Sequence, residues 1–438
     1  MRAPLLFSGS TPILRSGSGS HQKVESRGRP AIPRILAMDG HAAVLKAPGK
    51  FRLSDAAIGA AVALAFSSTA LFMAAMLLMP KLAGSRDYVV YWATGQQLVH
   101  HADPFDPRLM NAVEHSTGFS APGTFYMRNP PWSLPLAYPL GFFSARAAAL
   151  PWSLLLLGLL VLSARMLWKM FGPTETRLDL LAYFFPPALV CVILGQTSLF
   201  LLLGLVLFLR LHRTRPFAAG AALWLCTLKP HLFVTFGLVL LAWILVGRRW
   251  RILAGAVTAL AASCAVTVLI DPAAFHQYLY WAAHSGISNE YIPCLSVELR
   301  TLIDPQAKWL AFVPVALGSV WALAYFWQNR ERWDWVEQGN VLMLVSLLVA
   351  PYCWIYDQSL ALPALMYAAW RAARGTQLTV LAALFILVEA ETFLAFWEAH
   401  AFYVWVAPAW LAWYLWVRRS PQHAEAAAME AAQVPSLG

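Results

Sequence analysis

The sequence has little charge for its length. Only 12% of its 438 residues are charged and 59% are hydrophobic, whereas about 25% of the residues in an average soluble domain are charged. A soluble fold of this size would not have enough polar surface to cover itself. The scarcity of charge therefore excludes an ordinary soluble protein and favours an integral membrane protein.

Several chemical signals are also missing. The five cysteines stand singly, without zinc-type spacing, and we interpret them as small apolar residues. The sequence has no strong G-x-G-x-x-G or Walker-type stretch, so a nucleotide-binding fold is not expected. It has no dense cluster of Asp, Glu and His either, and we therefore expect no metal and no other cofactor.

The net charge of +10 has an explanation other than nucleic acid. Lys and Arg gather in short segments between apolar runs and in the first fifty residues, rather than along one helix face. Cationic loops stay on the cytoplasmic side of a membrane. The charge therefore predicts topology and contact with membrane lipids, and no nucleic-acid partner.

The chain divides into a membrane domain, residues 51–420, between two cytoplasmic tails. Residues 1–50 are rich in Ser, Gly, Pro and Arg, which predicts a basic, disordered tail, and Met38 is a second candidate for the first residue. Residues 421–438 form the other tail. Residues 56–79 are uncharged and exceed the roughly 20 residues needed to cross a bilayer, so they predict the first span.

Further apolar segments follow, separated by basic clusters. They lie at residues 130–143, 147–167, 180–194, 198–211, 216–228, 232–246, 252–270, 309–327, 341–353, 359–370, 378–396 and 402–416. Two cytoplasmic ends require an even number of spans, and the Pro-rich segment 130–143 is the candidate for a re-entrant or half-length helix. We predict an all-α, polytopic helical bundle with about 11–13 transmembrane segments.

Two long polar loops, residues 80–129 and 271–308, are predicted on the external face. In the first, which we expect to carry short amphipathic helices, Asp87 stands at the membrane exit and is followed by Tyr91 at helical spacing. An apolar cavity would disfavour the charged form of such an acid, which suits a general base. The alternative is a solvated loop carboxylate beside an aromatic belt at headgroup level.

Other polar residues interrupt apolar segments. They are Gln196, Lys229, His231 and Asp357. An ionisable group at a helix centre costs at least about 2.5 kcal/mol, which favours a functional role. Each lies near a segment end, however, and a lysine such as Lys229 can alternatively extend its ammonium to the membrane surface.

The second loop adds His284 and Arg300 to the face on which we place Asp87. Two polar loops on one face favour a shared site, and the alternative is that both are solvated caps.

Four stretches in this order resemble the bacterial polyprenyl-phosphate-sugar-dependent glycosyltransferases of family 87, within the GT-C fold class. They are DYVVY, beginning at Asp87 and followed by ADPFDP, the Gly195–Gln196 pair, LCTLKPH and APYCWIYDQSL, and they extend over about residues 80–365. The resemblance implies a GT-C-type bundle. It also implies an inverting enzyme of the bacterial inner membrane, with its active site on the periplasmic face.

The resemblance further implies the substrates and the roles of residues. The donor would be a mannose-like hexose or a pentose on polyprenyl phosphate, and the acceptor a glycolipid or polysaccharide. Asp87 would be the general base, and Tyr356 and Asp357 would border the same cavity. The sequence departs from the family pattern at His101, where a small residue is expected, and at Phe105, where Tyr is common.

Inverting transfer from such a donor needs a base and cations that stabilise the departing phosphate. The cation candidates are Lys229 and Arg300, with His231 or His284 as hydrogen-bond donors. A transporter or flippase of lipid-linked saccharides is the main alternative, although the chain shows no inverted repeat. A polymerase or ligase of lipid-linked glycans shares the donor class and stays open, and a non-catalytic scaffold is the least favoured.

Overall fold

The computed structural model describes residues 52–78, 87–118, 125–172, 178–284, 290–372, 375–395 and 403–419. Every described residue belongs to the second of two units, residues 46–438. The two predicted tails lie outside the described residues. Within the described ranges all regular secondary structure is helical, which confirms the all-α prediction.

The helices follow the predicted apolar segments closely. In chain order the described α-helices are α1 (Arg52–Leu78), α3 (Tyr88–Val99), α4 (Pro107–His115), α5 (Leu134–Ala137), α6 (Ala145–Phe171), α7 (Asp179–Tyr183), α8 (Pro186–Leu194), α9 (Ser198–Leu211), α10 (Pro216–Ala222), α11 (Val234–Val246), α12 (Trp250–Ile270), α13 (Ala274–His284), α14 (Leu295–Ile303), α15 (Val313–Asn329), α16 (Gln338–Val349), α17 (Leu362–Ala369), α18 (Gly375–Ala395) and α19 (Val406–Arg418). Short 3-10 helices join several of them: η2 (Pro131–Ser133), η3 (Tyr138–Phe142), η4 (Leu223–Leu228), η5 (Pro230–Phe233), η7 (Lys308–Phe312), η8 (Arg330–Arg332) and η9 (Ile355–Ala361).

In the described part of the chain, 4 helices are long and apolar enough to cross a membrane: Ala145–Phe171, Trp250–Ile270, Lys308–Arg332 and Gly375–Thr392. Shorter apolar helices accompany them, at Asp55–Leu71, Asp179–Leu194, Ser198–Leu211, Pro216–Leu228, Pro230–Val246 and Gln338–Val349. The protein is therefore an all-α membrane protein, as predicted. The exact number of spans and the external position of the loops stay predictions.

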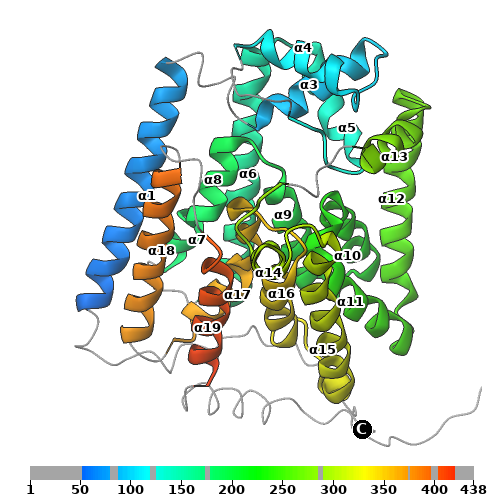
Figure 1. The fold of residues 1–438 in the computed structure, drawn as a ribbon. Helices are drawn as coiled ribbons and strands as arrows, with labels where there is room; N and C mark the ends of the chain where they lie inside the picture. The colour runs from blue at the N-terminus through cyan, green and yellow to red at the C-terminus, as the bar shows by residue number, and fades with distance from the viewer. Residues whose placement is uncertain are drawn as a thin grey trace, which may run out of the picture. The chain divides into compact units, whose positions relative to one another are not determined.

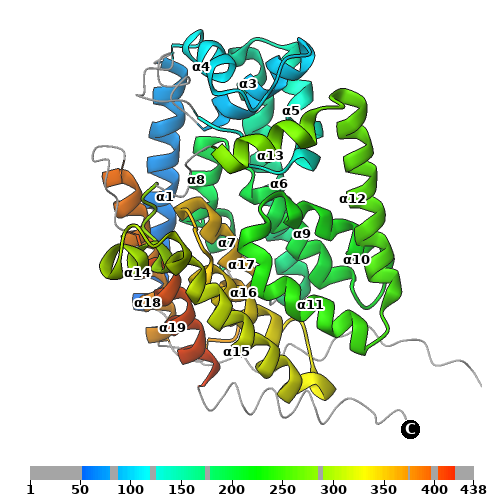
Figure 2. The same cartoon turned by 45° about the vertical axis from the view of Figure 1, so that its right-hand side comes forward.

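Within the second unit, helices that are distant in sequence lie side by side. α1 packs along α18, and α10 packs along α12 (Figure 1). α3 and α4 lie together at one end of the bundle, with α13 close by in both views (Figure 2). The first long loop therefore covers one end of the helices.

The Pro-rich segment 130–143 is not one continuous helix. It forms η2, α5 and η3 in succession, because its prolines lack the N–H that a longer helix would need. It packs so tightly on α3 that a Cβ added to Gly95 would lie 2.4 Å from the carbonyl oxygen of Ala137. The prediction of a less than full-length helix at this segment is confirmed.

The first loop carries two short helices. α4 is amphipathic, as expected, with Met110 and Glu114 buried and most of its other residues exposed. Its N-cap is Asp106, whose Oδ1 accepts the backbone N–H of Arg108 at 2.7 Å. α3 differs from the expectation, since most of its residues are buried. The reason is that α4, α5, η3 and α6 all pack around it.

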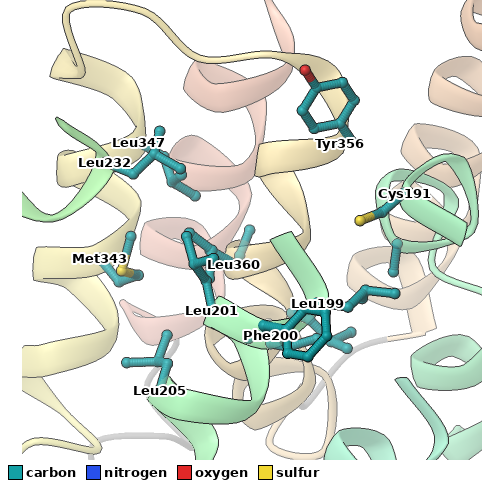
Figure 3. Packing of buried hydrophobic residues seen from close by; sticks show 14 of the residues in the cluster. Cys191, Leu199, Phe200, Leu201, Leu205, Leu232, Met343, Leu347, Tyr356 and Leu360 are labelled. Carbon is teal, nitrogen blue, oxygen red and sulfur yellow. The ribbon is translucent and has the colours of Figure 1, made fainter. Parts of the chain in front are cut away.

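The core of the bundle is aliphatic and aromatic. Figure 3 shows Leu201 and Leu205 of α9 near Met343 of α16 and Leu360 of η9, with Tyr356 at the edge of this packing. Leu201 and Leu360 have no exposed surface. Close packing of this kind fixes the positions of α9, α16 and η9, each of which carries or adjoins a polar residue discussed below.

The two long loops contact each other. The ring of Phe105 lies 5.4 Å from that of Tyr278 on α13 and 6.3 Å from that of Trp281. Arg128 Nη2 lies 2.6 Å from Glu290 Oε1. Both contacts join residues at least 162 positions apart in the chain. They hold the two loops over a common region, as a shared site requires.

Glu114 is a buried acid of the first loop. Its side chain has no exposed surface, and its Oε2 accepts the backbone N–H of Phe125 at 3.0 Å. Burial raises the pKa of Glu114 from 4.5 to about 7. The folded chain thus holds this proton more tightly than the unfolded chain does. The resulting stabilisation is fully present below pH 4.5 and is lost as the pH rises through about 7.

We expect the substitution Glu114→Gln to raise the free energy of unfolding by about 2 kcal/mol at pH 8 and to change it little at pH 5. The amide cannot ionise, yet its oxygen can still accept from Phe125. Thermal unfolding of the detergent-solubilised protein at both pH values measures this. Glu331→Gln, a change of the same kind at an exposed glutamate of η8, is the control. A Glu114→Gln effect that is equal at both pH values would contradict the prediction.

Candidate active site

Three interruptions between helices converge on the start of α3. Gly195 to Thr197 separate α8 from α9, Lys229 separates η4 from η5, and residues 350–354 separate α16 from η9. Asp87 immediately precedes α3. The polar side chains of this apolar bundle therefore lie at or next to breaks between helices. This explains why the sequence shows them near the ends of apolar segments.

Gly195 makes the first of these interruptions. It ends α8 in a left-handed conformation with φ +79°, and a Cβ added to it would lie 2.5 Å from the Cβ of Tyr88 on α3. Glycine is therefore required both by its conformation and by the close approach of α3. Its carbonyl oxygen accepts the indole N–H of Trp152 at 2.8 Å. This geometry places Gln196 directly against the start of α3.

Gln196 links α3 to the rest of the site. Its Nε2 donates to Asp87 Oδ2 at 2.8 Å, and its Oε1 accepts the hydroxyl of Tyr91 at 2.9 Å. The same Oε1 accepts Lys229 Nζ at 3.3 Å. Both functional ends of the amide are therefore engaged by residues that the sequence had singled out.

Lys229 and Asp357 form the centre of the network. Lys229 Nζ lies 2.7 Å from Asp357 Oδ1 and 3.0 Å from Ser198 Oγ, and it lies 4.5 Å from the ring centre of Tyr356. Ser198 also donates to Asp357 Oδ1, at 2.6 Å. The lysine is thus paired within the protein, instead of extending to the surface.

The network is buried along most of its length. Asp357 has no exposed surface, Gln196 is 8% exposed and Lys229 is 9% exposed, whereas Asp87 is only half-buried. Burial raises the pKa values of the Tyr91 and Tyr356 hydroxyls, so both remain protonated. The chain of polar groups therefore leads from a closed interior to the carboxylate of Asp87.

His231 lies beside this network. Its ring stacks on that of Tyr352, with 3.7 Å between ring centres. Its Nε2 is buried and has no hydrogen-bond partner among the described residues. The positive charge of Arg128 acts electrostatically on both rings. His231 and Tyr352 thus form a second polar pair, and Arg128 is held at the second loop by its pair with Glu290.

His284 and Arg300 lie on α13 and α14, respectively. His284 is exposed on α13, where its ring stacks on Tyr280 and its Nδ1 lies 2.7 Å from the carbonyl oxygen of the same residue. Arg300 is buried on α14, which packs against η7, α15 and α16. Their roles stay predictions.

Sequence reasoning missed several residues that the structure brings to the site. Ser198, Asn129 and Arg128 are the main ones. Asn129 Nδ2 donates to the carbonyl oxygen of Leu228 at 2.9 Å and so fixes the backbone beside Lys229. Ser198 follows the Gly195–Gln196 pair, and Arg128 and Asn129 immediately precede the Pro-rich segment. Those neighbours were the only local signal, because Ser or Asn near a helix end and Arg in a polar loop are all common.

Comparison with known proteins gives one match. A family model for glycosyltransferase family 87 matches residues 126–351, which is more than half of the 438 residues. No curated protein and no solved structure matches the chain. The matched region contains Gln196, Lys229 and His231, while Asp87 and Asp357 lie outside it.

The all-α membrane fold and the buried polar network define a membrane protein with a candidate enzymatic site. The match to the family model identifies the class of enzyme: the chain belongs to glycosyltransferase family 87. It is a membrane glycosyltransferase, and it uses a sugar donor and an acceptor.

Proposed function

We propose that the protein transfers a mannose-like hexose, or a pentose, from a polyprenyl-phosphate donor to a glycolipid or polysaccharide acceptor. We place the reaction on the external face of the bacterial inner membrane. A lipid-linked donor suits this chain because its tail can stay in the bilayer while its sugar reaches the polar end of the bundle. No nucleotide-binding fold is then required, in keeping with the absence of strands from the described residues.

One observation carries the proposal: a buried chain of hydrogen bonds ends at the half-buried carboxylate of Asp87. Gln196 holds Oδ2 of this carboxylate at 2.8 Å, and the two long loops meet over the same end of the bundle. A carboxylate that is both oriented and accessible is what a general base requires. The remaining polar groups of the network face inward, where no acceptor sugar could reach them.

The reaction then proceeds by a single inverting displacement. The acceptor hydroxyl gives its proton to Asp87, and its oxygen forms a bond to the anomeric carbon of the donor sugar. The bond between that carbon and the phosphate oxygen breaks, and polyprenyl phosphate leaves with the bonding electron pair. Asp87 acts on the face opposite the leaving group, so the configuration at the anomeric carbon is inverted.

The departing phosphate needs cations or hydrogen-bond donors. Arg128 and His231 suit this role, because His231 Nε2 is buried with no partner among the described residues and the positive charge of Arg128 acts electrostatically on it. An arginine also matches phosphate geometry with its fork of N–H groups. Arg300 and His284 remain candidates from the sequence for contacts with the substrates.

The donor class is tested in proteoliposomes that contain the purified protein and an acceptor extract but no endogenous polyprenyl phosphate. We expect label to be transferred from radiolabelled polyprenyl-phosphate mannose, and none from the corresponding nucleoside diphosphate sugar. Free polyprenyl phosphate should inhibit, because it is the leaving group. The acceptor extract comes from a deletion strain, whose surface glycolipids lack the sugar in question.

Two outcomes would overturn the proposal. Direct use of the nucleoside diphosphate sugar would exclude a lipid-linked donor. Movement of labelled donor across the bilayer without any transfer would favour the flippase alternative. Empty liposomes and the Asp87→Asn protein serve as controls for background transfer.

A further inference from the structure

The ammonium group of Lys229 has no N–H left over for a substrate. An ammonium has three donors, and Nζ has three acceptors within hydrogen-bonding distance: Asp357 Oδ1 at 2.7 Å, Ser198 Oγ at 3.0 Å and Gln196 Oε1 at 3.3 Å. The Tyr356 ring covers it from another side. The positive charge is balanced by Asp357, which has no exposed surface.

Binding a phosphate with Lys229 would require breaking this pair. The carboxylate of Asp357 would then lose its cation in a site from which water is excluded. Removing one partner of a buried ion pair is strongly unfavourable. Arg128 faces no such obstacle, because its pair with Glu290 is about one-third exposed on each side. The lysine is therefore poorly suited to the donor phosphate.

The same contacts orient the amide of Gln196. Lys229 Nζ and the hydroxyl of Tyr91 both point to Oε1, at 3.3 and 2.9 Å. Lys229 can only donate, and burial raises the pKa of Tyr91, so its hydroxyl keeps its proton. With two donors on the oxygen, the NH₂ group must face the other way. It faces Asp87 Oδ2, at 2.8 Å.

We propose that Lys229 and Asp357 form a positioning pair that acts on Asp87 through Gln196. The pair holds the amide in the one orientation that donates to the base, which fixes the carboxylate and favours its charged form. Lys229 is thus a positioning residue and not a phosphate ligand. This inference rests on the proposed role of Asp87 as general base.

Several ionisable groups of the network act on Asp87. Among the described residues, the electrostatics of Tyr91 and Tyr356 respond directly to Asp87, and both tyrosines stay protonated because burial raises their pKa values. Lys229 and Asp357 follow in the network and balance each other. A change of charge at position 196 therefore acts directly on Asp87 and on Lys229, the two charged groups that Gln196 contacts.

The test is the pH profile of the variant Gln196→Glu, which has nearly the same shape. Its carboxylate would share one proton with Asp87, because two carboxylates at this distance do not both ionise readily. Lys229 and Tyr91 would stabilise the charge on the new glutamate, so the shared proton would sit on Asp87 and block the base. We expect the acidic limb of kcat/KM to move up by about one pH unit or more.

A matched control is available on α3. Gln96→Glu makes the same chemical change at a residue whose Nε2 donates to the carbonyl oxygen of Gly141 at 2.7 Å, away from Asp87. Its pH profile should keep the wild-type acidic limb. If Asp87→Asn is inactive but the acidic limb of the Gln196→Glu pH profile does not shift, the positioning role is overturned. The role of Asp87 as general base would then still stand. A fully active Asp87→Asn would instead overturn the proposed function.

A second measurement, which does not depend on pH, distinguishes a positioning role of Lys229 from a role as phosphate ligand. The double variant Lys229→Met with Asp357→Ala removes both charges, so no unpaired charge is left in the interior. We expect kcat to fall by tenfold or more while the inhibition constant of polyprenyl phosphate stays within threefold of wild type. Arg128→Gln is the comparator for loss of a phosphate contact. A tenfold weaker inhibition in the double variant would show that Lys229 holds the phosphate and would overturn the proposal.

Discussion

Replacing Asp87 by Asn should reduce kcat for sugar transfer by about 10²–10⁴-fold, the usual contribution of a positioned general base. The asparagine oxygen can still accept the 2.8 Å hydrogen bond from Gln196, so the network and the fold should persist. What is lost is the ability to take the acceptor proton. Initial rates with radiolabelled polyprenyl-phosphate sugar, at saturating donor and acceptor, measure the effect.

The control for this substitution lies in the same loop. Asp106→Asn makes the same change at the N-cap of α4, where Oδ1 accepts two backbone N–H groups. Asparagine caps a helix about as well as aspartate, so this variant should retain wild-type activity. Transfer by Asp87→Asn within tenfold of wild type, with normal expression and insertion, would remove Asp87 from the role of base.

Much of the fold could be predicted from the sequence. The segment 198–211 was predicted as one apolar helix and is α9, Ser198–Leu211, since an uncharged run ended by a basic cluster leaves few alternatives. Segment 180–194 was predicted as continuous, and the structure divides it into α7 and α8. Pro186 and Pro187 explain the division, because a proline disfavours helical backbone at the residue before it.

The sequence predicted which residues belong to the site but not how they are arranged in space. The cost of placing ionisable groups in a membrane singled out Lys229 and Asp357. Nothing in their spacing could show that they would lie 2.7 Å apart, because 128 positions separate them. Pairing in space depends on how the interrupted helices pack. That information is spread over the aliphatic core and does not reside in any motif.

The role expected for Lys229 illustrates this limit. From the sequence, a basic residue at a segment end of an enzyme with a phosphate-linked donor is assigned to the phosphate. Only the three acceptors around its ammonium favour another role. Arg128, which the sequence did not single out, is the phosphate ligand that we propose instead, and its pair with Glu290 holds it at the contact between the two loops.

Asp357→Ala should lower the free energy of unfolding by about 3–5 kcal/mol, the usual consequence of removing one partner from a buried ion pair. Asp357 accepts three hydrogen bonds, from Lys229 Nζ, the hydroxyl of Ser198 and the backbone N–H of Trp354. Alanine leaves all three donors without this acceptor, and one of them is charged. Thermal unfolding of the detergent-solubilised protein, followed by size-exclusion chromatography, measures the loss.

The comparison with the double variant makes this prediction specific. Lys229→Met together with Asp357→Ala should recover most of the lost stability, because the buried charge is removed along with its partner. The matched single control is Asp304→Ala, at an exposed aspartate whose Oδ1 accepts the backbone N–H of Gln306; a surface change of this kind costs about 0.5 kcal/mol or less. If Asp357→Ala were as mild as the control, or the double variant as unstable as the single one, the pair would not be the buried, charged element that holds Gln196 in place.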